Sequence, residues 1–229
     1  MDEEVTKVKI MDLDTSQFKF RPVKMKSKFR ELFVDLQNLI VKFGKLRVPF
    51  DSRINTFGQS EISLSLGDTY TKKYSSEDLI NKIKSIDVYL QEMAKKEKWL
   101  EGFPSGIRYN PILKESQNSN FPPTLKVKLA KNRQEVISKF YDADKKVIEF
   151  ENEQELLSLI TKGTIILSGI EFAGIFFNDK TWGMTCKIYN AQILPYEKIE
   201  IFQQEKNDIN VDFLDSSDSE NENECLLDE

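Results

Sequence analysis

The sequence contains no histidine among its 229 residues. Histidine is the commonest general base, the usual activator of serine and cysteine nucleophiles, and a frequent zinc ligand. Its absence removes most routes to acid–base and zinc catalysis, and no tight cluster of aspartate and glutamate takes its place. We therefore predict a protein that is not an enzyme and that uses no cofactor and no metal.

Cysteine and long apolar runs are scarce as well. Cys186 and Cys225 are the only cysteines, and neither has a partner at metal-ligand spacing. Two such residues do not make a disulfide framework, so a reducing compartment fits best. No apolar run approaches the ~20 residues of a membrane span, and Met1-Asp2-Glu3-Glu4 is no secretory signal. We expect a soluble intracellular protein that does not bind membranes.

Hydrophobic residues make up only 39% of the chain and charged residues 31%, with a mean hydropathy of -0.47. This balance predicts a folded body joined to a polar or disordered segment. Phenylalanine is nevertheless abundant, with 16 copies against 2 tryptophans. Phenylalanine fills cores and also offers flat faces on which nucleobases stack, and composition alone favours the core.

The net charge of -5 hides an uneven distribution. Residues 205–229 contain ten acids and one base, Lys206, so this tail carries -9 and residues 1–204 carry +4. A disordered, solubilising end would look like this. The alternative is a tail that mimics a phosphate backbone, competes for a basic groove and anchors a partner protein through its apolar residues. Those residues are Phe213, Leu214, Leu226 and Leu227.

Alternation of apolar and polar residues predicts a strand-rich body. The expected strands are Val5–Leu13, Gln17–Val23, Glu31–Phe43, Ile62–Leu66, Leu125–Leu129, and a closing hairpin of Thr164–Phe177 and Thr181–Leu194. Gly169, Gly174 and Gly183 within the hairpin suggest bulges or sharp coiling, as a small closed barrel requires.

Helical spacing and capping signals predict two helices. Ser75–Trp99 repeats apolar residues along one face, and Ser75 with Asp78 resembles a capping pair. Asn152–Thr161 is a short helix capped by Asn152. Gly44–Gly58 is expected to form a long basic loop and Gly102–Pro123 a second loop.

Together these elements predict a mainly β (α+β) fold: an OB-like β-barrel with an inserted helix and a disordered acidic C-terminal tail. The expected domain spans residues 1–204, with the helical insertion around residues 75–100. The tail spans residues 205–229.

Basic side chains fall on the outer faces of two predicted strands. Strict alternation in Leu125–Leu129 places Lys126 and Lys128 together, and in the last strand it places Thr185, Lys187 and Tyr189 on one face. Lysines that deter edge pairing would give the same pattern as lysines that bind an anion. We predict phosphate contacts from Lys45, Arg47, Lys126, Lys128, Lys180 and Lys187, and base stacking on Phe50, Phe176 and Tyr189.

Three motifs in order resemble a known family. They are Leu32-Phe-Val-Asp-Leu-Gln with Val48-Pro49-Phe50, then Phe121-Pro-Pro-Thr-Leu-Lys-Val-Lys128, then Leu167-Ser-Gly-Ile-Glu-Phe with Lys180-Thr-Trp-Gly-Met-Thr-Cys-Lys187. Between the first two lies a helix bearing Ile86-Asp87. The order and spacing, over residues 35–194, resemble the single-stranded-DNA-binding proteins of nucleocytoplasmic large DNA viruses. That group is similar in plan to phage replication proteins with an OB fold and acidic tail.

The resemblance implies sequence-independent binding of single-stranded DNA in viral replication, recombination or repair, in the host cytoplasm (viral factory) or nucleus. Viral replication proteins would be partners of the tail, and a homo-oligomer is compatible with the sequence. Two features depart from the group. The motif Arg47-Val-Pro-Phe-Asp stands where the group has a fuller Thr-Pro-Phe-Gly motif. The tail ends Leu-Leu-Asp-Glu, without the terminal aromatic residue of the phage proteins. A structural or adaptor protein that uses the barrel for protein contacts, and a carboxylate–metal nuclease, remain as rival interpretations.

Overall fold

The computed structural model describes residues 7–20, 24–26, 29–32, 34–35, 40–56, 58–69, 74–103, 106–118, 120–133 and 135–194. The predicted acidic tail and its four apolar residues lie outside this set. Within it, neither helix is both long and apolar enough to cross a membrane.

Among the described residues, five strands close into a barrel. Their order around the barrel is β6, β8, β11, β16 and β15, and β15 pairs back with β6. All neighbours are antiparallel except β11 and β16, which are parallel. A five-stranded closed sheet with a mixed pairing of this kind is an OB-like barrel, as predicted. The strands are β6 (Ile40–Arg47), β8 (Ser60–Thr69), β11 (Thr124–Leu129), β15 (Ile165–Phe177) and β16 (Thr181–Leu194).

Short strands extend this sheet. Those that add to a barrel strand are β1 (Lys7–Lys9), β4 (Phe29–Leu32) with β3 (Lys24–Lys26), β7 (Arg53–Ile54), β9 (Arg108–Tyr109), β10 (Leu113–Lys114) and β14 (Lys139–Tyr141). Two separate pairs are β2 (Lys19–Phe20) with β5 (Val34–Asp35), and β12 (Lys131–Asn132) with β13 (Glu135–Val136).

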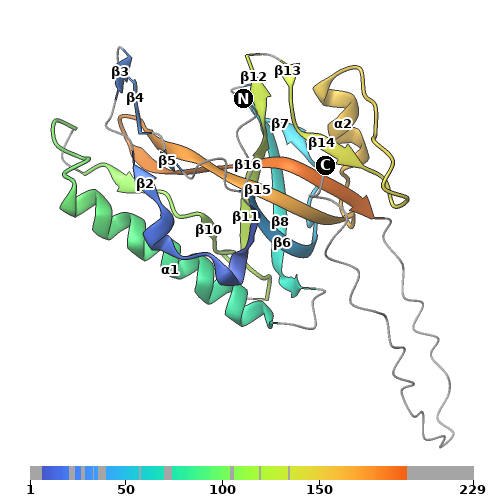
Figure 1. The fold of residues 1–229 in the computed structure, drawn as a ribbon, viewed down its shortest axis with the longest axis horizontal. Helices are drawn as coiled ribbons and strands as arrows, with labels where there is room; N and C mark the ends of the chain where they lie inside the picture. The colour runs from blue at the N-terminus through green and yellow to red at the C-terminus, as the bar shows by residue number, and fades with distance from the viewer. Residues whose placement is uncertain are drawn as a thin grey trace, which may run out of the picture.

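The two longest strands do more than close the barrel. β15 and β16 pair from Ile165 opposite Leu194 to Phe177 opposite Trp182, and their far halves run past the barrel (Figure 1). We call residues 172–177 and 181–186 the hairpin arm. The register shifts at Gly169/Ile170 and at Phe172/Gly174, so two of the predicted glycines mark irregularities of the pairing, as expected.

The helix α1 (Ser76–Lys96) packs along one side of the barrel and arm (Figure 1). Ser75 and Asp78 form the predicted capping box, and Leu79, Ile83, Ile86 and Leu90 are fully buried. Beyond its end, Trp99 meets Trp182 of the arm edge-on, with ring centroids 6.2 Å apart. The segment that follows the helix therefore contacts the hairpin arm.

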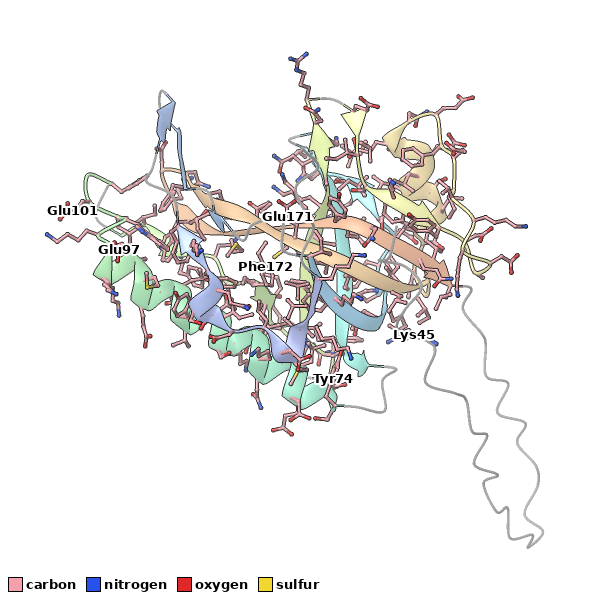
Figure 2. The ribbon with its side chains drawn as sticks, viewed as in Figure 1. Lys45, Tyr74, Glu97, Glu101, Glu171 and Phe172 are labelled. Atoms are coloured by element: carbon pink, nitrogen blue, oxygen red, sulfur yellow. The ribbon has the colours of Figure 1, made fainter. Side chains whose placement is uncertain are left out.

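One face of the arm packs into the core. Phe172 is buried against Phe18, with ring centroids 6.0 Å apart, and Phe177 stacks on Phe103 at 5.2 Å. Figure 2 shows Phe172 directed into the space between the arm and the elements beneath it. Phenylalanine at these positions is core, which leaves the opposite face of the arm for other uses.

A buried carboxylate fastens α1 to the loop that contains β9 and β10. Asp87 is 7% exposed, and its oxygens accept hydrogen bonds from the Tyr109 hydroxyl at 2.5 Å and from the backbone N–H groups of Ile112 and Leu113 at 2.8 and 3.3 Å. Burial raises the pKa of Asp87, and these three hydrogen bonds oppose that shift. The carboxylate therefore sets the position of residues 109–113.

Several predicted boundaries were wrong. Gly44–Arg47 belongs to β6 and is not loop: Lys42 pairs with Gly169 and Lys45 with Leu167, so Gly44 lies in a β-bulge. Residues 102–123 are not all loop, because β9 and β10 add to the sheet. In the described part of the predicted first strand, Lys7–Lys9 alone pairs as a strand, since Ile10–Asp12 forms a 3-10 turn; Ile10 and Leu13 are both buried.

The second predicted strand is short as well. Thr15–Gln17 is a 3-10 turn and only Lys19–Phe20 pairs, while residues 21–23 lie outside the described set. The run predicted at Glu31–Phe43 is divided among β4, β5 and β6. The second helix, α2 (Glu153–Leu159), lies between β14 and β15 with Asn152 as its cap, as predicted.

Replacing Asp87 with alanine should lower the free energy of unfolding by about 2–4 kcal/mol, because three buried donors lose their acceptor. Thermal or urea unfolding measures this change. Glu92→Ala, on the exposed face of the same helix, is the matched control and should change stability by less than about 0.5 kcal/mol. Equal effects of the two variants would contradict the anchoring role of Asp87.

Candidate nucleic-acid interface

A groove runs between the barrel and the hairpin arm. It consists of two adjoining hollows of about 670 and 160 Å³ that share Ser60, Lys128, Phe176 and Thr185. Strands β8 and β11 form one wall, and the outer face of the arm forms the other. The groove therefore lies on the face of the second and third barrel strands, which OB folds use to bind oligonucleotides.

The lining of the groove is rich in cations. Of the described residues, six basic and two acidic side chains line the two hollows. The acids are Glu61 and Glu153, and the bases are Lys114, Lys126, Lys128, Lys131, Arg133 and Lys187. A chain that carries -5 overall thus has a groove of opposite sign.

Two lysines face each other across the floor of the groove. Lys128 on β11 lies directly opposite Lys187 on β16, and like charges in that position repel. Burial lowers the pKa of Lys128, and Lys187 adds to the effect. Lys128 donates a hydrogen bond to the Gln59 side chain at 2.7 Å.

Neither lysine forms an ion pair with a carboxylate in the part of the chain that the structure describes. Glu171 is the partner of Lys187 on the other side, across β15 and β16, but the two side chains form no salt bridge. An anion that entered the groove would relieve the repulsion between Lys128 and Lys187.

Phe176 supplies an aromatic wall to both hollows. It projects from the outer face of the arm, in contrast to the buried Phe172 and Phe177. Gly183 makes room beside it: a Cβ at this position would lie 3.3 Å from the Phe176 ring and 2.5 Å from the carbonyl oxygen of Asn110. The glycine lets the β9 segment approach the arm and complete the smaller hollow.

The groove contains Lys126, Lys128, Lys187 and Phe176 of the predicted site. The alternation predicted for the last strand is also confirmed, because Trp182, Met184, Cys186 and Ile188 are buried while Thr185 and Lys187 are half-buried. Lys114, Lys131 and Arg133 were not predicted. Lys131 and Arg133 continue the basic run after β11, and that run was the available signal. Lys114 reaches the groove only through the fold of the β9–β10 segment.

The other predicted residues do not line this groove. Lys45 and Arg47 lie on β6, and Figure 2 shows Lys45 at the end of the barrel away from β12. Phe50 follows β6 and is 63% exposed, Lys180 lies in the turn at the tip of the arm, and Tyr189 is 37% exposed beyond Lys187 on β16. Their roles in binding remain predictions.

The described residues contain no group of three Cys, Asp or Glu side chains that could hold a metal ion. Cys186 lines the smaller hollow, but burial raises the pKa of its thiol, which keeps it protonated and a poor nucleophile. What the groove offers instead is positive charge beside an aromatic face.

Comparison of the sequence with protein-family models and with curated proteins finds no match. Among solved structures, the chain is similar to gp2.5, a single-stranded DNA binding protein encoded by bacteriophage T7. The identity is 12% and the TM-score 0.48, over 73% of this chain and 98% of that one. It is also similar to the single-stranded DNA-binding protein from bacteriophage Enc34, at 14% identity and a TM-score of 0.40, over 83% and 96% of the two chains. Because these identities and TM-scores are low, the assignment of an OB-like barrel to this chain rests on the strand pairings described above.

Lys128→Gln should raise the free energy of unfolding by about 0.2–1 kcal/mol, because it removes one of two opposed like charges. The pKa of Lys128 is lower in the folded chain than in the unfolded one, so the unfolded chain binds this proton more tightly. Stability of the wild type therefore rises as pH increases toward the ordinary lysine value, and the variant lacks this contribution.

Urea unfolding at neutral and alkaline pH measures both effects. Lys139→Gln, on the exposed side of β14, is the control and should leave stability unchanged. A loss of stability in Lys128→Gln at neutral pH would mean that this lysine is structural.

Proposed function

We propose that the groove binds single-stranded DNA without regard to sequence. The observation that carries this proposal is the opposed pair Lys128 and Lys187, with no carboxylate partner in the described chain, beside the ring of Phe176. The pair supplies charge for phosphates, and the ring supplies a face for a base. Lys128 lies on the strand face that OB barrels use for oligonucleotides, and Lys187 on β16 and Phe176 on β15 line the groove beside it.

The aromatic wall favours single strands over duplex. In a duplex each base is covered on both faces by its neighbours, so a side chain reaches only base edges. An unpaired strand can stack a base on Phe176 while its backbone follows the lysines, and a stack of this kind contributes about 1–3 kcal/mol. Every base has such a face, so binding tolerates any sequence.

A DNA strand longer than the groove would leave it at the two ends of the groove. The loop between β6 and β8 contains Phe50, and the turn between β15 and β16 contains Lys180. These two loops correspond to those that OB folds add to the strand face. We propose that Phe50, Lys180 and Tyr189 extend the contact, and that Lys45 and Arg47 contribute only if the strand wraps around the barrel.

The biological setting that we propose is viral DNA replication, recombination or repair. This proposal is based on the sequence motifs given above. The acidic tail would compete with DNA for the groove and recruit replication proteins. This part of the proposal rests on the charge of -9 over residues 205–229 against +4 for the rest of the chain.

Fluorescence anisotropy of labelled oligo-dT across a salt series tests the groove. If three to five phosphates are neutralised, the slope of log K against log salt should be about -2 to -3.5. Lys128→Ala/Lys187→Ala should flatten that slope by about 1.4, because two phosphate contacts are lost. Lys95→Ala/Lys96→Ala, on the exposed end of α1, has the same charge change and should leave affinity and slope almost unaltered.

Unchanged binding by the Lys128→Ala/Lys187→Ala variant would remove the groove from the contact. Absence of any salt-sensitive binding by the wild type would favour the adaptor interpretation, in which the barrel contacts proteins.

A chain that ends at Gln204 tests the tail. We expect tighter and more salt-dependent binding of oligo-dT than by the full chain, because the tethered competitor is gone. Adding the free peptide of residues 205–229 should weaken binding again. Identical isotherms for the two chains at low salt would show that the tail does not enter the groove.

A further inference from the structure

Each hollow of the groove contains one carboxylate, and that carboxylate forms an ion pair with a lysine of the same hollow. In the smaller one, Glu61 lies 2.6 Å from the Lys126 ammonium; in the larger one, Glu153 lies 2.6 Å from that of Lys131. Of the lysines that line the groove, two are thus neutralised from within the chain. Lys128 and Lys187 are not.

Glu61 is placed among three cations. Besides Lys126, it lies 3.8 Å from the Arg53 guanidinium, and Lys128 is close enough to act on its charge. The hydrogen bond from Lys126 holds the pKa of Glu61 below its ordinary value, so the side chain is ionised at neutral pH. A backbone phosphate placed at this point would meet the same three cations.

Glu153 lies in the first turn of α2, where a carboxylate interacts favourably with the helix dipole, but only one of its two oxygens has a partner among the described residues. Its Oε2 contacts Lys131, but its Oε1 is buried and accepts no hydrogen bond from any described residue. A buried oxygen without a partner is unfavourable, and this cost offsets part of what the mostly buried ion pair contributes to folding. A glutamine at this position could keep the contact with Lys131 without placing a charge in the groove.

We infer that Glu61 and Glu153 occupy phosphate positions in the free protein, where they act as internal counterions that nucleic acid must displace. This inference rests on the proposed function and adds an affinity-setting role for two acids. They hold Lys126 and Lys131 in place in the groove but keep affinity below what six cations would give.

The salt dependence distinguishes an internal counterion from a distant charge. A lysine that neutralises a phosphate releases the cations condensed on that phosphate, and this release produces the slope. When the phosphate must first displace a tethered carboxylate, the freed carboxylate attracts cations in turn, so the net release is smaller. Removing the carboxylate charge should therefore both tighten binding and steepen its slope.

Glu61→Gln and Glu153→Gln, made separately and together in the full chain, test the inference by anisotropy with oligo-dT. Each single variant should bind about 3- to 10-fold more tightly at low salt. Each should also steepen the slope of log K against log salt by about 0.7, which is the contribution of one phosphate contact on a single strand. Glu92→Gln on α1 changes the net charge equally and should alter affinity less than about twofold.

Thermal unfolding of each variant shows that it is folded, and the two sites lie on different elements, so each supports the inference separately. If the wild type binds but neither groove variant differs from Glu92→Gln, or both bind more weakly, the inference is overturned and the proposed function stands. If neither the wild type nor any variant binds, both are overturned.

Discussion

The pairing of β15 with three other strands is the constraint on which the rest of the structure depends. β15 pairs with β16 over its whole length, with β6 at its start and with β4 near its end. The pairing with β6 closes the barrel, and β16 brings β11 alongside in parallel. Bulges at Gly169/Ile170 and Phe172/Gly174 let one strand serve the barrel and then continue past it.

The groove is a consequence of that continuation. Side chains alternate between the two faces of the arm, and the bulge at Phe172/Gly174 shifts that alternation by one residue, so Phe172 and Phe177 both enter the core while Phe176 faces the barrel wall. The core contacts of Trp182 with Trp99, and the anchoring of residues 109–113 by Asp87, hold the arm at a fixed distance from β11. A rigid arm gives a preformed groove, and a preformed groove holds cations close together even though they repel.

Local periodicity predicts the elements that carry their own signal. The alternation around Lys126 and Lys128, the capped helix from Ser75, and the closing hairpin follow from nearest neighbours in the sequence. The prediction of a loop from Gly44 was wrong because a glycine in a β-bulge and a glycine in a loop look alike in sequence. For this reason Lys45 and Arg47 were predicted to lie in a loop, although they belong to β6.

The meeting of Lys128 with Lys187 could not be predicted, because it depends on a parallel pairing between segments far apart in the chain. The same holds for Lys114, which reaches the groove through the Asp87 anchor, and for the ion pairs of Glu61 and Glu153. Sequence alone indicated which faces were basic. Barrel closure decides which of those faces meet and which of their charges are already balanced.

The central claim, that a single strand lies in the groove between β11 and the arm, is tested most directly by photocrosslinking. Oligo-dT with 5-iodouracil at single positions, irradiated in complex with the full chain, attaches to aromatic side chains in contact with the base. We expect the attached peptide to contain Phe176. Attachment confined to Phe121, or to aromatic residues of α1 and the N-terminal segment, would place the strand elsewhere and contradict the account.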